Sequence, residues 1–388
     1  MIAPATVTNA KWGSLTWNLD ADGNFTITGT GAMDAAGNYY SYPWYNYGSY
    51  FTSITIGTDI TTVAAAAFGG DNNTNNYGGV TTVKLPSTLT TIGENAFAYC
   101  TGATFNANNL IARGVTIGED AFNQVGCIEG TLSNNGDNTT MLSLMANARS
   151  ANVTITGRTL YKDGNWNTIC LPFDVKSDNS LLTDATVKEL DLYGYYSEEG
   201  VYYSYAAANL RRTGFDAENG TLYLYFKDAT ADSDDNLLKA GTPYLMKWPS
   251  GGTDITGDLT FEGVKVISSP QTLTSEDGHV SFRGTYASTT FNAENKSILL
   301  LGEANALYWP QSGAGIGACR AYFEMNGGAN AVRSFVLNFG EETSSMHNAQ
   351  FTMHNEAGAW YTLDGRKLDG KPTVKGVYIH GGRAVVVK

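Results

Sequence analysis

The 388-residue chain has few cysteines, few charged side chains and no long hydrophobic run. Its four cysteines lack C-x-x-C spacing and are too few for a disulfide-rich scaffold, so neither that class of protein nor a common zinc site is expected. No run of 18 or more apolar residues is present, which predicts no transmembrane helix. The opening residues Met-Ile-Ala-Pro lack the basic segment and apolar core of a signal peptide.

Charge is scarce and mostly negative. Asp, Glu, Lys and Arg make up 16% of the residues, and the net charge is −13. A nucleic acid or an anionic lipid surface requires a basic footprint on its protein partner, so we expect neither as a partner. In contrast, Gly and Tyr are abundant, with 44 and 23 copies. Together with many Thr and Asn residues, they favour pleated strands joined by turns and predict a mainly β fold.

An internal repeat is the strongest pattern in the chain. ITIGTDITTVAAAAF at 54–68 and VKLPSTLTTIGENAF at 83–97 align position by position, and a third copy places Ile117 and Phe122 five residues apart. In the first two copies the aligned apolar residues are Ile56, Ile60, Val63 and Phe68 with Leu85, Leu89, Ile92 and Phe97. This period predicts a solenoid, in which each unit buries its apolar edge on the next and the outside is available for binding.

The segment GENAFAYC at 93–100, preceded by LPSTLTTI, resembles the BspA-type leucine-rich repeat, whose pattern is I-P-x-x-V-x-x-I-G-x-x-A-F-x-x-C. Copy one departs from it, with Ala64 in place of the glycine and no cysteine after Phe68. The resemblance implies a short solenoid with Cys100 packed in the stack. Because BspA-like proteins are exported bacterial surface proteins, it also implies a secreted or cell-surface location.

Four regions are expected along the chain. Residues 1–135 hold the repeats and, at 12–30, a hairpin that caps them, while the repeat pattern fades over 101–135. Residues 136–150 form a helical connector, since Thr139–Arg149 has helical apolar spacing with Asp137 or Asn138 as N-cap. Residues 151–342 show short strands between turns, which is typical of an antiparallel β-sandwich. Residues 343–388 give a linker and a C-terminal tail of three short strands.

Two further resemblances concern the second half. The stretches WNTICLPF at 166–173 and CRAYF at 319–323 resemble segments of large exported Bacteroidetes proteins. The tail resembles the C-terminal segment of secreted Bacteroidetes proteins that serves type IX export and surface attachment, although three strands completing the preceding fold explain it equally well. Cys170 and Cys319 either pair or remain buried thiols.

Aromatic residues supply the candidate ligand-binding positions. Eight Tyr, Trp and Phe residues lie between 39 and 51 among Gly, Ser and Asn, a composition favoured by adaptable binding loops. A second cluster, at 193–205, has the pattern of a hairpin. The candidates are Tyr42, Trp44, Tyr45, Tyr47, Tyr195 and Tyr203. The alternative for Trp44 is that it wedges the hairpin against the first repeat.

No catalytic or metal-binding constellation stands out. His347 and His354 are seven residues apart, which is not a metal-pair spacing, and the acidic stretch at 232–236 lacks the distal glutamate of a calcium loop. We therefore expect no enzyme, no cofactor and no metal. The interpretation is a non-enzymatic adhesion or interaction protein that binds a protein or glycan ligand through its repeat surface. The alternative is a glycan-binding accessory protein that uses the aromatic clusters.

Overall fold

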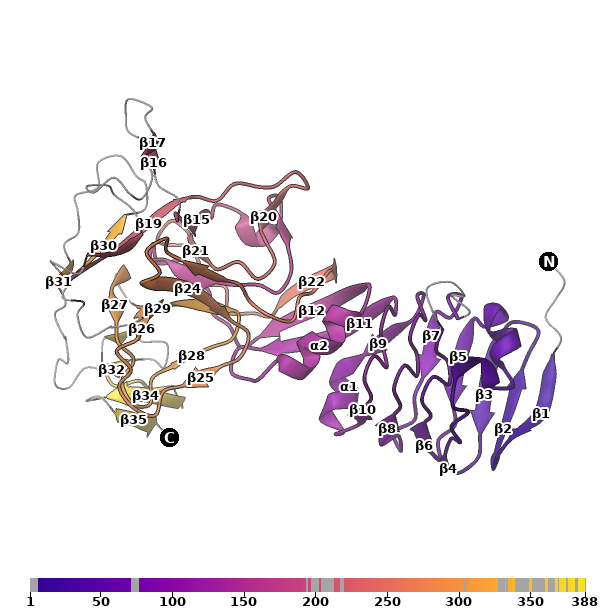
Figure 1. The fold of residues 1–388 in the computed structure, drawn as a ribbon. Coiled ribbons are helices and arrows are strands. Elements are labelled where there is room, and N and C mark those ends of the chain that lie inside the picture. The colour runs from indigo at the N-terminus through magenta and orange to yellow at the C-terminus, as the bar shows by residue number, and fades with distance from the viewer. Residues whose placement is uncertain are drawn as a thin grey trace. The chain divides into compact units, whose positions relative to one another are not determined.

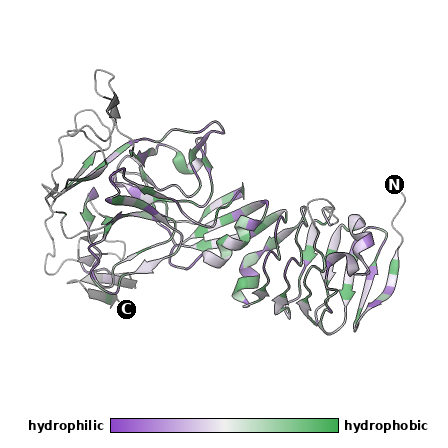
Figure 2. Cartoon of the chain, in the orientation of Figure 1, coloured by the Kyte–Doolittle hydropathy of each residue, from purple (hydrophilic) through white to green (hydrophobic). Residues whose placement is uncertain are grey.

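The computed structural model describes residues 6–70, 77–192, 195–196, 202–203, 213–216, 220–302, 305–326, 332, 334–338, 349–350, 360–361, 367–368, 370–374, 376–380 and 383–387. Among these residues strands dominate, and the two α-helices are short: α1 (Ala107–Ala112) and α2 (Thr139–Asn147). Hydrophobic and hydrophilic residues alternate along many of the strands (Figure 2), as expected where one face of a sheet is buried. The chain is therefore mainly β.

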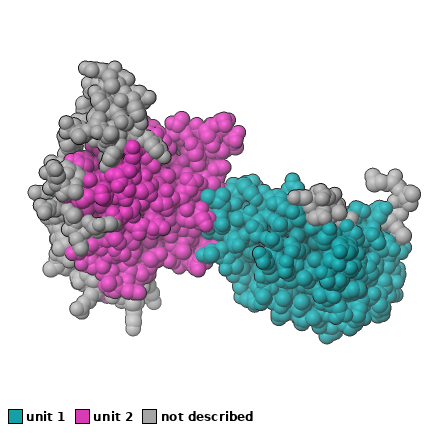
Figure 3. Space-filling view, in the orientation of Figure 1, with its two compact units in different colours: residues 1–132, 139–155, 259–268 teal, residues 133–138, 156–258, 269–388 magenta. Residues whose placement is uncertain are grey.

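Contacts divide the chain into two units (Figure 3). Unit 1 comprises residues 1–132, 139–155 and 259–268, and unit 2 comprises residues 133–138, 156–258 and 269–388. This division differs from the four expected regions. Helix α2, expected as a connector, belongs to unit 1, and so does a ten-residue segment from the middle of the expected sandwich.

Unit 1 begins with an antiparallel ribbon of β1 (Val7–Trp12), β2 (Leu15–Leu19) and β3 (Asn24–Thr28). The turn between β2 and β3 is closed by the Asp20 carboxylate, which accepts hydrogen bonds from the backbone N–H groups of Asp22 and Asn24 at 3.0 and 2.8 Å. The pKa of the Asp20 carboxyl is lowered first by the hydrogen bond that it accepts from the Asn24 side-chain amide at 2.9 Å, and then by these backbone bonds, because all of them favour its charged form. The hairpin expected at 12–30 is present, and it gains an outer strand.

The repeats stack as two ladders of parallel strands (Figure 1). In the first ladder, β5 (Ser53–Ile56) and β7 (Thr82–Lys84) extend the sheet of the ribbon. In the second, β4 (Gly31–Ala32), β6 (Ile60–Val63), β8 (Thr91–Ile92) and β10 (Thr116–Ile117) lie side by side. Val63 pairs with Ile92, and Ile92 pairs with Ile117. The aligned positions of the three copies are thus neighbouring rungs.

A column of stacked rings runs through the core of unit 1. The ring centroids of Phe68 and Phe97 are 5.6 Å apart, and those of Phe97 and Phe122 are 5.9 Å apart. The ring planes of these two pairs are within 10° and 3° of parallel. Trp44 stacks on the other side of Phe68 at 5.7 Å, so it extends the column by one rung before the first copy. The Cys100 thiol donates to the Phe68 carbonyl at 3.4 Å, inside the stack as the repeat pattern implies.

The ladder continues beyond the third copy. Strands β9 (Thr104–Asn106), β11 (Cys127–Ser133) and β12 (Ser150–Thr156) form one sheet, although the sequence pattern fades over 101–135. Helix α2 packs on β11 at Gly130, where a Cβ atom would lie 2.2 Å from the Met141 sulfur. The sheet ends with β22 (Leu259–Val264), which pairs antiparallel to β12. A segment more than a hundred residues later therefore covers the last strand of the array.

Unit 2 is built on two sheets. One has the order β13 (Asn167–Ile169), β21 (Tyr244–Lys247), β15 (Thr186–Leu190), β19 (Thr221–Asp228), β30 (Ser334–Asn338) and β31 (Ala349–Gln350), with β18 (Gly214–Asp216) also paired to β19. The other has the order β23 (Thr272–Thr274), β24 (Val280–Thr285), β29 (Arg320–Met325), β26 (Ile298–Leu301) and β27 (Leu307–Tyr308). Most pairs are antiparallel, but β19 and β30 are parallel, because the chain reaches β30 after β29 of the other sheet and not through a hairpin.

The two sheets of unit 2 share one hydrophobic core. Phe226 of the first sheet meets Phe282 of the second edge to face at 6.2 Å, and Phe282 stacks on Phe323 at 4.5 Å. In the tail, β33 (Lys367–Leu368), β32 (Trp360–Tyr361), β34 (Gly376–His380) and β35 (Arg383–Val387) form a separate antiparallel sheet. It contains one strand more than the three expected.

Candidate interaction surface

The outward face of the first ladder consists of hydroxyl and amide side chains. Because side chains alternate along each strand, Ile54 and Ile56 point into the core of unit 1 while Ser53 and Thr55 point out. Parallel pairing then aligns the outward residues in rows across β3, β5 and β7: Asn24, Ser53 and Thr82 in one row, and Thr26, Thr55 and Lys84 in the next. The two rows carry a single charged residue, so this face, called here the ladder face, suits a largely neutral partner.

The second ladder also carries a row of hydroxyl side chains, all of them threonines. Thr62 of β6 pairs with Thr91 of β8, and Thr91 pairs with Thr116 of β10. Thr90, the residue before β8, donates its hydroxyl to the Thr61 carbonyl at 3.1 Å, so some of the hydroxyl groups beside this ladder are bonded to backbone carbonyls. On the ladder face the Ser53 hydroxyl donates to the Asn24 side-chain oxygen at 2.8 Å, so each ladder carries some hydroxyl groups that are already bonded.

Two of the candidate binding residues are buried. Trp44 is fully enclosed and donates its indole N–H to the Ala67 carbonyl at 2.7 Å, while Tyr42 is 2% exposed and donates its hydroxyl to the Ala65 carbonyl at 2.7 Å. Burial raises the pKa of the Tyr42 phenol. Neither ring presents a face to a ligand. The wedge alternative holds for Trp44, because its ring closes the aromatic column against the first repeat.

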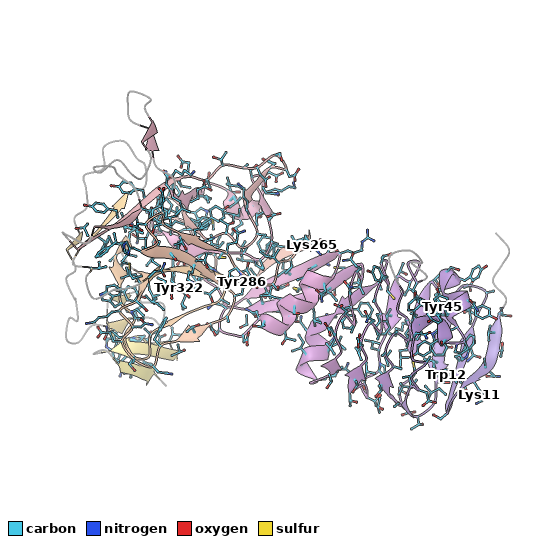
Figure 4. All side chains as sticks on the ribbon, in the orientation of Figure 1. Lys11, Trp12, Tyr45, Lys265, Tyr286 and Tyr322 are labelled. Atoms are coloured by element: carbon cyan, nitrogen blue, oxygen red, sulfur yellow. The ribbon has the colours of Figure 1, made fainter. Side chains whose placement is uncertain are left out.

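The other rings of this segment lie nearer the surface. They are carried by two 3-10 turns, η1 (Tyr39–Ser41) and η2 (Tyr45–Tyr50). Tyr40 is 62% exposed and Tyr50 is 44% exposed. Tyr45, the first residue of η2 (labelled in Figure 4), is half-buried, and Tyr47 is half-buried with its ring centroid 6.0 Å from that of Trp17. The exposed positions Tyr40 and Tyr50 were not among the predicted ones; their flanking Ser and Asn residues were the available signal.

The second aromatic cluster forms the expected strand pair. Strands β16 (Tyr195–Tyr196) and β17 (Tyr202–Tyr203) pair antiparallel, with Tyr195 opposite Tyr203. The side chains of these candidate residues lie outside the described part of the structure. A ligand-binding role for Tyr195 and Tyr203 therefore stays a prediction.

Two cysteines and an arginine lie close together in the core of unit 2. Cys170 and Cys319 are both free thiols, and their backbones are joined by a hydrogen bond from the Cys170 N–H to the Cys319 carbonyl at 3.1 Å. Arg158, 1% exposed, donates to the carbonyls of Cys319 and Thr168. Among the described residues no group of three or more His, Cys, Asp or Glu side chains could hold a metal ion. The acidic turn at 232–236 is closed on itself by Asp232 accepting from Asn236 N–H at 3.0 Å.

Raising the pH from 9 to 11 is expected to lower the free energy of unfolding. Burial raises the pKa of the Cys319 thiol to about 11 from its ordinary 9, and burial raises the pKa of the Tyr244 phenol to about 12 from 10. The unfolded chain releases these protons first, so the folded state binds more protons in this window and stability falls as pH rises. Two pKa units correspond to a loss of about 3 kcal/mol in the free energy of unfolding for Cys319.

Urea denaturation at a series of pH values measures this slope. Cys319→Ser removes one titrating group, so its slope between pH 9 and 11 should be shallower by up to about 1.4 kcal/mol per pH unit, whatever its stability at pH 7. An unchanged slope in this variant would show that the thiol ionises equally in both states.

None of the described helices is long and apolar enough to cross a membrane.

Comparison with known proteins bears on unit 1. Residues 40–163 match the family model of the BspA type leucine rich repeat region in six copies, which extends the repeats past the third copy visible in the sequence and agrees with the continued ladder. No curated protein matches the chain. A solved leucine-rich repeat protein from Eubacterium ventriosum is 21% identical over 39% of this chain, with a TM-score of 0.28. The chain spans 44% of that protein's length. Residues 40–163 are thus similar to BspA-type repeats, a class of interaction repeat.

Proposed function

We propose that the protein is an exported, non-enzymatic surface or secreted protein that binds a macromolecule through its leucine-rich repeats. The observation that carries this proposal is the ladder face, whose rows of Ser, Thr and Asn side chains are held in register by the parallel pairing of β3, β5 and β7. Similarity of residues 40–163 to BspA-type repeats supports an interaction role and a location outside the cytoplasm.

Rigidity is the physical advantage of this surface. The strands beneath it are fixed by the ring column and by hydrogen bonds from rung to rung, such as Thr81 N–H to the Thr52 carbonyl at 3.0 Å. A partner therefore binds a face whose backbone is already ordered, and little conformational entropy is lost there on association.

Charge inserted in the ladder face tests the proposal. The full chain is immobilised and assayed by surface plasmon resonance against a panel of purified extracellular-matrix and bacterial surface proteins. Thr55→Glu and Thr82→Glu, each at an outward position, should weaken binding at least about tenfold, because a neutral partner that covers the new carboxylate must desolvate it, even at position 55, where Lys84 lies opposite. Thr289→Glu, at an exposed threonine of β25 (Thr289–Thr290) in unit 2, is the matched control. Binding that both ladder variants retain, or a panel with no binder, contradicts the proposal.

A further inference from the structure

Three tyrosines of the 3-10 turns form a compact surface cluster, called here the tyrosine platform: Tyr39, Tyr40 and Tyr45. The Tyr39 ring lies 5.3 Å from that of Tyr40 in an edge-to-face arrangement and 5.5 Å from that of Tyr45. Tyr40 is the most exposed of them at 62%, and large exposed aromatic side chains mark interaction sites more often than isolated apolar ones do.

The platform is held in place from below. Its turns are anchored by Tyr42 and Trp44, whose side chains bond to the carbonyls of Ala65 and Ala67 in the first repeat. The turns are closed by their own backbone bonds, including Tyr45 N–H to the Tyr42 carbonyl at 3.0 Å. The rings therefore sit on a fixed support, and ligand binding does not have to order the loop that carries them.

The chemistry around the platform points to a neutral, hydroxyl-rich ligand. From residue 35 to residue 58 the chain contains no Asp, Glu, Lys, Arg or His. The polar groups between the rings are amides and hydroxyls, and Ser41 is bonded to Asn38 through its hydroxyl at 2.7 Å. A charged partner would find no counter-charge within this segment. A sugar ring matches it, since its C–H face packs on an aromatic ring and its hydroxyls bond to amides and hydroxyls.

We propose that the tyrosine platform is a carbohydrate-binding site that stacks the pyranose rings of a neutral polysaccharide on Tyr40 and Tyr45. The proposal rests on the protein acting as a binding protein, but it uses a different surface from the ladder face. Tyr42 and Trp44 act in it as positioning residues beneath the rings, and Tyr40 and Tyr45 touch the sugar.

Affinity electrophoresis and isothermal titration calorimetry of the full chain test the proposal, with soluble neutral glucans, mannans and galactans as probes and the anionic polysaccharide polygalacturonate as the comparison. Tyr40→Ala and Tyr45→Ala should each weaken binding about two- to tenfold, and the double variant by about tenfold or more. Tyr40→Phe keeps the ring and should retain most of the affinity. Tyr378→Ala, at a tyrosine in β34 of unit 2 whose hydroxyl bonds to the Val374 carbonyl at 3.0 Å, should bind as the unaltered protein does.

Three results would overturn the platform as a carbohydrate site: no retention by any neutral polysaccharide, equal affinity in the double variant, or binding confined to anionic polysaccharides and lost with salt. Thr55→Glu separates this site from the proposed protein-binding function. If Thr55→Glu loses binding to a protein partner but keeps its affinity for polysaccharide, the carbohydrate site is supported independently of the ladder face. If the Tyr40 and Tyr45 variants keep binding to the protein partner, the ladder face is supported independently of the tyrosine platform. A thermal melt of each variant confirms that it is folded.

Discussion

Replacing Phe97 with alanine is expected to lower the free energy of unfolding by about 3–5 kcal/mol. Phe97 is fully buried between Phe68 and Phe122, whose rings stack on its two faces at 5.6 and 5.9 Å. The cost is high because the cavity cannot close. Backbone hydrogen bonds of 2.8 and 2.9 Å from Phe68 and Phe97 to the following copies fix the spacing of the rungs, so the neighbouring rings cannot move in to fill the space.

Urea denaturation followed by circular dichroism measures this loss. Phe97→Leu serves as the comparison, because it keeps most of the buried apolar volume and should cost clearly less than alanine. Tyr40→Ala, at a ring 62% exposed, should change the free energy of unfolding by about 0.5 kcal/mol or less. A loss below about 1 kcal/mol for Phe97→Ala would show that the column does not hold the rungs together.

The stacking of the repeats was predictable because apolar periodicity records which residues share a core. Val63, Ile92 and Ile117 occupy the same place in each copy, and the structure pairs them in register. The same holds for the phenylalanine that ends each copy. The hairpin at 12–30 was predictable for a related reason, since alternation and an Asp-rich turn are both local signals.

Contacts distant in sequence were not predictable in this way. Short strands between turns are expected throughout 151–342, but that pattern does not identify the partner of any strand, and only the folded chain shows that β22 joins β12 at the end of the array. For Trp44 the sequence allowed two interpretations, a ligand-binding ring or a wedge against the first repeat, because the Tyr, Ser, Gly and Asn around it are typical of a surface loop. In the folded chain the Trp44 ring stacks on Phe68, one rung before the first copy. Trp44 lies outside the aligned copies, so the repeat pattern does not indicate this position.

Replacing Gly93 with valine is expected to destabilise the protein by about 3 kcal/mol or more, as overpacking does at its upper end. Gly93 follows β8, and a Cβ atom there would lie 2.4 Å from the backbone nitrogen of Ala65 in the preceding copy. Gly118 repeats this geometry one rung later, 2.4 Å from the backbone nitrogen of Glu94. Backbone cannot rotate away as a flexible side chain can, so neighbouring rungs must separate.

Strand propensity alone predicts that this substitution raises stability, so the experiment distinguishes propensity from the close backbone contact. Valine favours strands and glycine does not, so on propensity alone the change would stabilise by up to about 1 kcal/mol. Gly257→Val is the matched control, because a Cβ atom at Gly257 meets nothing within 4 Å. Thermal and urea melts of the two variants should therefore differ widely, and equal stabilities would contradict a close approach between rungs.

The same contact explains why copy one departs from the repeat pattern. Ala64 stands where Gly93 and Gly118 stand in the next copies, and it is buried without being a glycine. Ala64 follows β6, and the neighbouring strand on the N-terminal side of the ladder is β4, which pairs with β6 in a shifted register. In the chain, β4 is followed by the Tyr-rich segment and not by the tight turn that follows the strand of a repeat copy. We infer that the backbone that forbids a side chain at Gly93 has no counterpart beside Ala64. The glycine of this repeat is thus required by the copy before it, and the first copy can do without one.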